Sequence, residues 1–349
     1  MNEELYAPKF KSYAAKKRRD AHMGKYLVKR FLQMLVVVFL VAFFTFLLVD
    51  LVPGDPVYIV AGREDLSQEQ YDMYYKELNL DKNIIVRFGI WISGAVHGDF
   101  GKSYIYHQDV WELIAPRAAT TFYLAFISLL LSVPIGIVFG IITAVYRNKW
   151  PDTTITLVAN ISNCLPQFWV GILLLILFSQ TLNLLPSQDF YWIGQEMKKG
   201  VYAGLGDHLR YIIMPVTCLA LQCIAGFTRQ TRSSMLEVIR SDFIRTARSK
   251  GLSERTVYFK HMLKNGLIPI ITGVGARLAR LMGGSMVVEN IFNIPGMGIT
   301  ARYAVQSKDV PLIQAIVLIT SLVTCVAFIL TDFAYAAVDP RISLTETGD

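Results

Sequence analysis

Residues 31–49, FLQMLVVVFLVAFFTFLLV, contain no charged side chain. A helix needs roughly 20 apolar residues to cross the hydrocarbon core of a membrane, and this run has about that length. Four further charge-free runs of comparable or greater length follow, at 118–146, 153–188, 211–228 and 310–331. We therefore interpret the 349-residue chain as an all-α membrane protein that crosses the bilayer several times.

The composition supports this class of protein. Hydrophobic residues make up 53% of the chain and charged residues 17%, whereas a soluble domain usually carries about 25% charged residues. A soluble enzyme, a nucleic-acid-binding protein and a disordered chain are therefore excluded as descriptions of the whole chain.

The net charge of +7 is unevenly distributed and indicates topology. Segment 1–30 holds nine Lys and Arg against three Asp and Glu, and segment 229–264 has the same ratio. Segment 51–117 holds six basic and ten acidic residues. Because positive charge is retained in the cytoplasm, we expect 1–30 and 229–264 inside the cell and 51–117 outside. The basic residues at 16–19 could also contact anionic lipid headgroups.

A sixth span is expected at 266–288, which is apolar except for Arg277 and Arg280. Each arginine near the bilayer centre costs about 2.5–3.5 kcal/mol, which the surrounding apolar residues partly offset. Six spans place both termini and all basic loops in the cytoplasm, whereas five spans do not.

We accordingly divide the chain into five parts. They are a basic cytoplasmic segment (1–30), a first span (31–50), an external segment (51–117), a five-helix core with the inner loop 229–264 (118–338), and a cytoplasmic tail (339–349).

The external segment is too long for a simple connection and is expected to form a small cap. Ser67 and Gln70 have the spacing of a capping box, which predicts a helix from there towards Leu78.

The inner loop is predicted to form two short helices separated by a turn. Gly251 suits the left-handed position after the first helix, and Ser253 suits the N-cap of the second. Ile239, Phe243 and Ala247 are spaced i, i+4, i+8, which predicts one apolar face on the first helix.

Motifs for catalysis are not found. Gly98–Ser103 resembles the end of a phosphate-binding loop, but the first glycine of that motif would fall on Val96, so an ordinary turn is expected. The histidines lack metal-ligand spacing, and no nucleophile lies near a base. Gly136 and Gly140 form a G-x-x-x-G pattern that predicts close helix packing.

Polar residues on the third apolar run have two interpretations. Asn160, Asn163 and Gln167 share one helix face, and Pro166 predicts a kink between the last two. Their side chains either bond neighbouring helices or line a water-filled path.

The inner loop resembles that of a known family. Residues 241–252, SDFIRTARSKGL, followed by 265–269, NGLIP, look like the cytoplasmic loop of ABC importer permeases, closest to the dipeptide, oligopeptide and nickel branch. Further motifs typical of the first permease of the pair in that branch cover nearly the whole chain. These are 52–56 (VPGDP), 78–81 (LNLD), 98–101 (GDFG), 289–298 (ENIFNIPGMG), 309–311 (DVP) and 339–342 (DPRI).

The resemblance implies a type I importer permease fold with six spans in a bacterial cell membrane. It also implies a homologous second permease, two cytoplasmic ATPase subunits that hold ATP and Mg²⁺, and an external substrate-binding protein, with no cofactor on this chain. The positions matching the family's ATPase-coupling loop are Asp242, Phe243, Arg245, Thr246, Ala247, Lys250, Gly251, Leu252 and Glu254.

The expected translocation path would be lined by Asn163, Gln167, Arg277 and Arg280. The two arginines are three residues apart on one helix face and suit a carboxylate of the ligand. Alternatively, they pair with acidic residues of the second permease or extend to the inner membrane surface.

The sequence leaves alternatives open for the ligand, for the role of the external cap and for the class of protein. The ligand is expected to be peptide-like, with nickel chelates, glutathione and opines as alternatives. The external cap either docks the binding protein or acts as a structural lid. A membrane scaffold or receptor, whose basic loop binds a different cytoplasmic partner, is the alternative from another class of protein.

Overall fold

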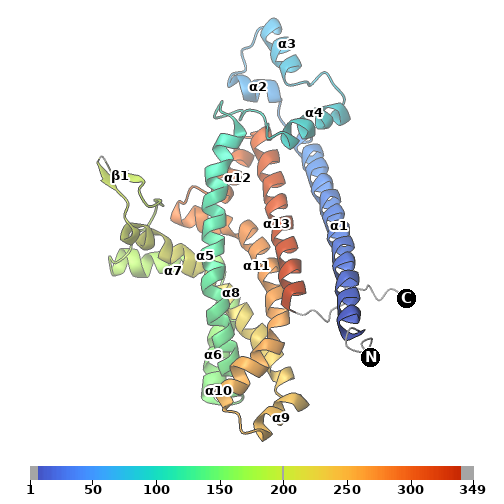
Figure 1. The fold of residues 1–349 in the computed structure, drawn as a ribbon. Helices are drawn as coiled ribbons and strands as arrows, with labels where there is room; N and C mark the ends of the chain where they lie inside the picture. The colour runs from blue at the N-terminus through green and yellow to red at the C-terminus, as the bar shows by residue number, and fades with distance from the viewer. Residues whose placement is uncertain (1–6, 199, 339–349) are drawn as a thin grey trace.

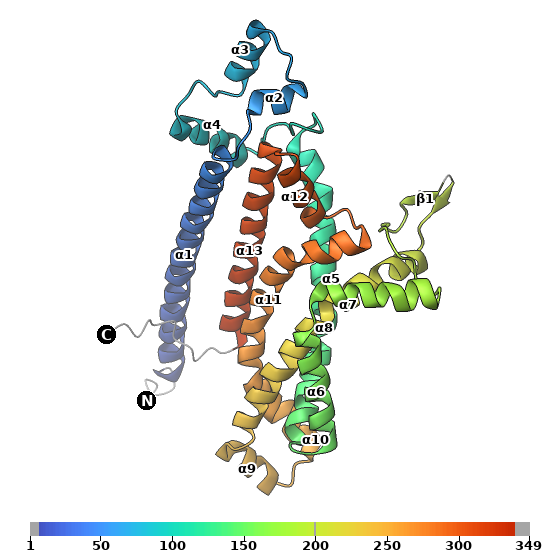
Figure 2. The same ribbon diagram turned by 180° about the vertical axis from the view of Figure 1, so that it is seen from behind.

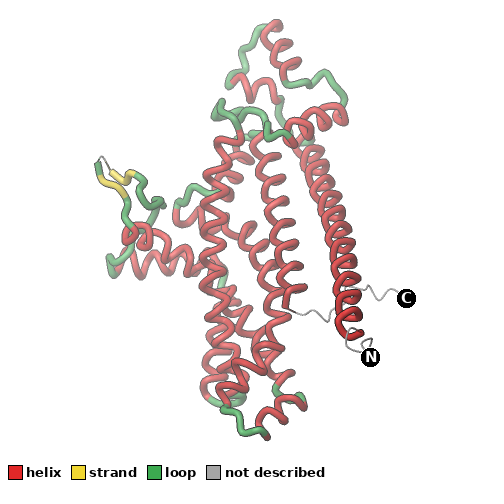
Figure 3. The backbone as a smooth tube through the Cα atoms, in the orientation of Figure 1, coloured by secondary structure: helices red, strands yellow, loops and turns green. Residues whose placement is uncertain are grey.

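The computed structural model describes residues 7–198 and 200–338. The tail 339–349, with the motif at 339–342, lies outside the described residues. Most of the described chain is helical, and five long helices extend along the length of the molecule (Figure 1, Figure 3). These are α1 (Ala7–Asp50), α5 (Val110–Val145), α8 (Leu205–Val238), α11 (Leu263–Phe292) and α13 (Val310–Val338).

The long helices cover five of the six predicted spans, and α1 begins earlier than predicted. Helices α1, α5, α8 and α13 are long and apolar enough to cross a membrane, and a fifth candidate is a bent helix pair at 150–181. Helix α11 contains the predicted span at 266–288 but is not among these candidates, and Arg277 and Arg280 lower its apolar character. The basic segment 1–30 is not a separate part of the described chain, because α1 already begins at Ala7.

The third apolar run does not form the continuous span predicted at 153–188. Helix α6 (Trp150–Cys164) and the pair α7 (Gln167–Leu174) and η1 (Leu175–Thr181), a π-helical segment, meet at an angle of 104°. Pro166 lacks an N–H and holds Leu165 in an extended conformation, with ψ 128°, so the helix cannot continue. The predicted kink is thus a sharp break.

The segment after this break forms a sideways arm. In both ribbon views α7 extends away from the bundle, and a short hairpin lies at the end of the arm (Figure 1, Figure 2). The hairpin pairs β1 (Glu196–Lys198) with β2 (Val201–Tyr202).

The external segment is folded, as predicted. It contains α2 (Pro56–Ala61), α3 (Gln68–Glu77) and α4 (Ile84–Val96), which lie together at one end of the bundle (Figure 1). The capping box is confirmed, because the Gln70 N–H donates to Ser67 Oγ at 3.3 Å and the Ser67 N–H donates to Gln70 Oε1 at 3.2 Å. We call this unit the outer cap (51–109).

Aromatic packing and buried hydrogen bonds help to fix the outer cap to the bundle. The buried ring of Phe88 on α4 packs edge-to-face against rings of α1, including that of Phe46 at 5.5 Å. The fully buried carboxylate of Asp309 accepts hydrogen bonds from the Ser103 hydroxyl and from the Tyr104 N–H at 3.2 Å. The 98–103 turn therefore has a structural role at the base of the cap.

Close packing of α5 on α8 forms the centre of the bundle. A Cβ atom on Gly136 would overlap the side chain of Phe227, and one on Gly140 would overlap Thr231. The predicted close approach at the G-x-x-x-G pattern is confirmed, and its partner is α8 of the same chain. A core cluster around Leu124, Leu219 and Phe227 continues this interface.

Candidate functional site

The inner loop lies at the end of the bundle opposite the outer cap (Figure 1, Figure 2). It consists of α9 (Asp242–Ser249), α10 (Glu254–Thr256) and the π-helical segment η2 (Val257–Met262). Ser241 is the N-cap residue of α9, but its hydroxyl donates to the Val238 carbonyl at the end of α8, at 2.6 Å, and does not cap α9.

The predicted turn between the two helices is confirmed. Gly251 has φ 75°, in the left-handed region that residues with a Cβ avoid. Ser253 is the N-cap of α10 and accepts from the Thr256 N–H at 3.4 Å.

The buried face of α9 differs from the prediction. Ile244 and Ala247 are buried against Met235, Val257 and Met262, in a cluster that also includes the inner end of α5. Ile239 belongs to the end of α8, and Phe243 is 44% exposed. Of the predicted face, Ala247 is buried and Ile239 packs against the same cluster from the end of α8. The prediction was wrong for Phe243, because the break at Ser241 interrupts the helix between Ile239 and α9.

The remaining predicted coupling residues face outwards. Besides Phe243, the exposed members of the predicted set are Asp242, Arg245, Thr246, Lys250, Gly251, Leu252 and Glu254. Asp242 and Arg245 form an ion pair at 3.5 Å that is almost fully solvent-exposed. The loop therefore presents a mixed charged and apolar surface on a base that is packed into the bundle.

An ion pair that sequence reasoning missed closes the turn. Arg248 Nε lies 3.0 Å from Glu254 Oε1, and Arg248 Nη2 lies 3.1 Å from Glu254 Oε2. The guanidinium of Arg248 lowers the pKa of Glu254, and a further hydrogen bond with Tyr258 acts in the same direction. This two-point contact joins α9 to α10 across Gly251. The six-residue separation gave no helical spacing by which to predict it.

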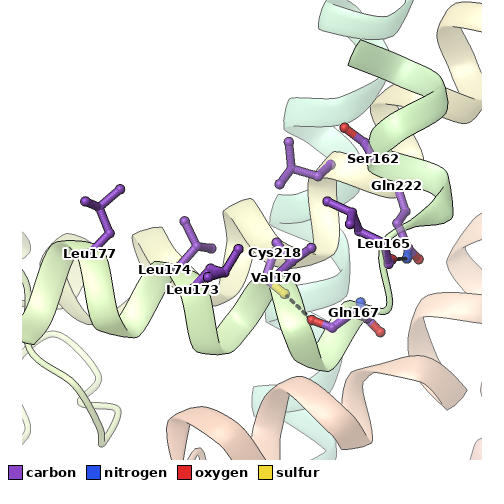
Figure 4. A pocket seen from close by; sticks show the side chains of 10 residues that line it. Ser162, Leu165, Gln167, Val170, Leu173, Leu174, Leu177, Cys218 and Gln222 are labelled. Atoms are coloured by element: carbon purple, nitrogen blue, oxygen red, sulfur yellow. Dashed lines mark hydrogen bonds between the residues drawn. The ribbon is translucent and has the colours of Figure 1, made fainter. Parts of the chain in front are cut away.

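The candidate path residues on the third run lie at the break between α6 and α7. Asn160 is exposed, whereas Asn163 Nδ2 is buried and has no hydrogen-bond partner in the described chain. The Gln167 carbonyl accepts from Cys218 Sγ at 3.4 Å, and Gln222 Nε2 donates to the Leu165 carbonyl at 3.3 Å (Figure 4). Thus α8 satisfies two of the carbonyls at the break.

A cavity of about 170 Å³ adjoins this break, and its wall is mostly leucine and valine side chains (Figure 4). Gln167 lies in the wall, and Asn163 does not. The structure therefore separates these two predicted path residues.

Arg277 and Arg280 also have different surroundings. Arg277 stacks on Phe227 with 4.0 Å between its Cζ and the ring centroid, and its Nη1 donates to Gln230 Oε1 at 2.9 Å. Both partners belong to α8 of the same chain. Arg280 is exposed. The structure thus gives Arg277 intramolecular partners, and an acidic residue is not among the contacts described for it.

Two further buried carboxylates organise the core and were not predicted as functional. Asp152, 5% exposed, accepts from Arg232 Nε and Nη2, both at 2.9 Å, and joins α6 to α8. Glu289, fully buried at the end of α11, accepts from the N–H groups of Gly298 and Ile299 in the first turn of α12 (Met297–Gln306). The sequence feature that could have identified Glu289 is its position as a single acidic residue beside an apolar span.

These features define a class of protein: a membrane permease with an exposed inner loop and a folded outer cap. The chain belongs to the family of binding-protein-dependent transport system inner membrane components, whose family model matches residues 136–344. The N-terminal model of the same transport systems matches residues 23–125.

Relatives agree over nearly the whole chain. It is 37% identical over 320 residues to a Brucella abortus (strain 2308) protein named as a peptide transport system permease, covering 92% of this chain and 99% of the relative. The same identity and coverage hold for the glutathione transport system permease protein GsiC of Escherichia coli (strain K12).

A solved structure supports the fold. An inward-facing crystal form of the MetNI methionine ABC transporter contains a chain with a TM-score of 0.53 and 16% identity, over 65% of this chain and 96% of that chain. The family models and these relatives identify the protein as a multi-pass permease subunit of an ABC importer.

Proposed function

We propose that this permease forms, with a homologous second permease, the membrane path for a peptide-like ligand delivered by an external binding protein. Two cytoplasmic ATPase subunits would supply the energy, with ATP and Mg²⁺ bound there and no cofactor on this chain. The observation that carries the proposal is the exposed face of α9 on a base packed into the bundle, at the opposite end from the outer cap.

The inner loop is suited to transmit movement in both directions. Ile244 and Ala247 anchor α9 against the ends of α5 and α8, so a displacement of α9 must move those helices too. The exposed ring of Phe243 would enter a groove on an ATPase subunit, and the charged residues around it would contact the rim of that groove.

Cross-linking tests this contact. Phe243→Cys should form a disulfide or a short bismaleimide link with an ATPase subunit that carries a cysteine in its docking groove. Lys149→Cys, on the connection between α5 and α6, serves as a control outside the proposed interface. Equal cross-linking at both positions would contradict the assignment of α9.

The topology is part of the proposal. With the basic segments inside, both termini and α9 lie in the cytoplasm and the outer cap lies outside. Labelling of single cysteines in intact cells, at position 64 in the cap and position 255 in α10, tests this. An impermeant maleimide should reach only the first of these positions.

Peptides are the ligand class that we propose, because one relative is named for peptide transport and another for transport of the tripeptide glutathione. Uptake by the reconstituted complex with its binding protein, measured with labelled dipeptide, labelled glutathione and a nickel chelate, distinguishes the ligand classes. Uptake of the nickel chelate alone would overturn the peptide assignment.

The outer cap is proposed to contact the binding protein. Its three helices and its fixed base make it a rigid surface, whereas a loop of this length without secondary structure would not be one. Deletion of 63–81 removes α3 and leaves the Asp309 contact intact. If the complex then binds its loaded binding protein with unchanged affinity, the cap is a structural lid.

A further inference from the structure

A cavity of about 630 Å³ lies between the outer cap and the outer ends of α1 and α13. Side chains of α3, α4 and the 99–107 loop form one side, and Phe46 and the first turns of α13 form the other. Sites for small ligands typically have volumes of about 300–1,000 Å³. The cavity is remote from α9 and from the break at Pro166.

Two buried polar groups in its wall lack partners. Gln314, in the second turn of α13, is 5% exposed, and its amide makes no hydrogen bond with the described part of the chain. The indole Nε1 of Trp91 is buried and likewise has no partner among the described residues. Buried polar groups are nearly always hydrogen-bonded, so these two groups indicate a polar occupant, which reaches Trp91 Nε1 only if the indole shifts, because this atom has almost no accessible surface.

The chemistry of the two groups specifies part of that occupant. Trp91 Nε1 can only donate, so it requires an acceptor such as a carbonyl or carboxylate oxygen. Gln314 offers two donors and an acceptor, the complement of a peptide amide. The occupant must therefore present both acceptors and an N–H group.

Charged side chains of both signs line the cavity. Arg87 and Lys102 supply positive charge, and Glu77 and Asp99 supply negative charge. Arg87 is held in place by Asp50, whose Oδ1 lies 2.7 Å from its Nη1. Burial raises the pKa of Tyr104 to about 12, so this hydroxyl in the wall stays protonated and can donate. A ligand with a carboxylate and an ammonium group matches such a site electrostatically.

We propose that this cavity binds a short zwitterionic peptide. Its carboxylate would face Arg87 and Lys102, its ammonium group would face Glu77, and its amide would bond Gln314 and Trp91. The ligand identity rests on the transport function proposed above. The cavity would then hold the ligand at the outer face of the permease, before it enters the membrane path.

Calorimetric titration of the assembled transporter tests this proposal. The complex would be prepared without its binding protein, in nanodiscs of phosphatidylglycerol, so that no zwitterionic lipid competes. The probes are Ala-Ala, glutathione, and Ala-Ala blocked by N-acetylation and C-amidation. We expect saturable binding of at least one free peptide, and about tenfold weaker binding of the blocked form.

Three variants locate the binding site. Trp91→Phe removes only the N–H, Gln314→Leu replaces the amide with an apolar group of similar size, and Lys102→Gln changes an exposed charge without altering the core. Each should weaken binding of the free peptide by about tenfold. Trp150→Phe, at a tryptophan that is 79% exposed and belongs to α6, should leave binding unchanged.

The possible results separate this proposal from the proposed function. Absence of binding for both free peptides, or equal binding by the parent complex and all three cavity variants, overturns the cavity as a peptide site even if peptides are transported. Absence of peptide uptake by the complete transporter with its binding protein overturns the proposed function instead.

Discussion

The carboxylate of Glu289 accepts a hydrogen bond from the backbone N–H of Gly298, with 2.7 Å between Oε2 and the nitrogen. Glu289 Oε2 also accepts from the Ile299 N–H at 3.1 Å, and Oε1 accepts from Thr121 Oγ1 at 2.7 Å. A carboxylate from α11 thus caps the N-terminus of α12, where the free N–H groups and the helix dipole favour negative charge. A side chain at position 296 would overlap Glu289, and one at position 298 would overlap Met286 as well as Glu289, which explains the glycines there.

Glu289→Ala should therefore destabilise the protein by about 1–3 kcal/mol, because the N–H groups of α12 would be left buried without partners. Glu289→Gln should cost less, since the amide oxygen still accepts. Thermal unfolding of the detergent-solubilised protein measures both. Glu237→Ala, at an exposed position of α8, is the control and should change the melting temperature little. Equal melting temperatures for Glu289→Ala and this control would contradict the capping role.

Because α5 packs closely on α8, substitution by alanine should have different effects on stability at Gly140 and at Gly206. Gly140→Ala should destabilise the bundle by about 1–3 kcal/mol, because the added methyl group overlaps Thr231 and the helices must separate. Gly206→Ala, in the first turn of α8, has open space around the new Cβ and should be neutral or slightly stabilising. The same unfolding assay compares the two variants. If Gly140→Ala is as stable as Gly206→Ala, the helices are farther apart than described.

The bond between Asp152 and Arg232 should contribute a measurable coupling energy. Asp152→Asn should cost about 1–3 kcal/mol, less than the 3–5 kcal/mol of a fully buried pair, because the Arg232 side chain is 30% exposed. A double-mutant cycle with Arg232→Gln isolates the pairwise energy. Additive effects of the two substitutions would show that the two-point contact does not stabilise the junction of α6 and α8.

Local patterns predicted more of this structure than contacts between distant residues did. Ser67 and Gln70 are three residues apart, and the left-handed turn at Gly251 depends on its neighbours, so both could be predicted from the sequence. The pairing of Asp152 with Arg232 joins residues 80 positions apart, and no spacing rule indicates which acid meets which base.

The break at Pro166 shows the same limit within one segment. Proline predicts an interruption, and the sequence around it is apolar on both sides, so a kinked span was the expected result. The 104° angle depends on where α8 offers partners for the carbonyls of Leu165 and Gln167, which only the fold determines.

Gly251→Val should uncouple ATP hydrolysis from transport. A β-branched residue at φ 75° costs about 1–2 kcal/mol of backbone strain, which shifts Leu252 and the exposed face of α9. We expect ATPase activity to persist while uptake per ATP hydrolysed falls. Gly62→Val, at φ 64° with equally open surroundings in the outer cap, is a matched control for the strain. An unchanged ratio of uptake to hydrolysis in Gly251→Val would exclude this turn from the coupling pathway.

Arg277 and Arg280 should have separable effects on transport, although both lie in the same predicted span. Arg277 is held by Phe227 and Gln230 of α8, so Arg277→Gln removes a stacking contact and a hydrogen bond that position the two helices. Uptake of acidic and neutral peptides should then fall by the same factor.

Arg280 is exposed in the single chain, and its guanidinium is therefore the one of the two that remains available to a ligand carboxylate or to the second permease. Arg280→Gln should lower uptake of an acidic peptide about tenfold relative to a neutral one, and Arg280→Lys should restore part of this preference by retaining the charge. Competition between Ala-Glu and Ala-Gln in one reconstituted preparation measures the ratio directly. If Arg280→Gln lowers both rates equally, this arginine acts in assembly of the permease pair, and the charge of the ligand is recognised elsewhere.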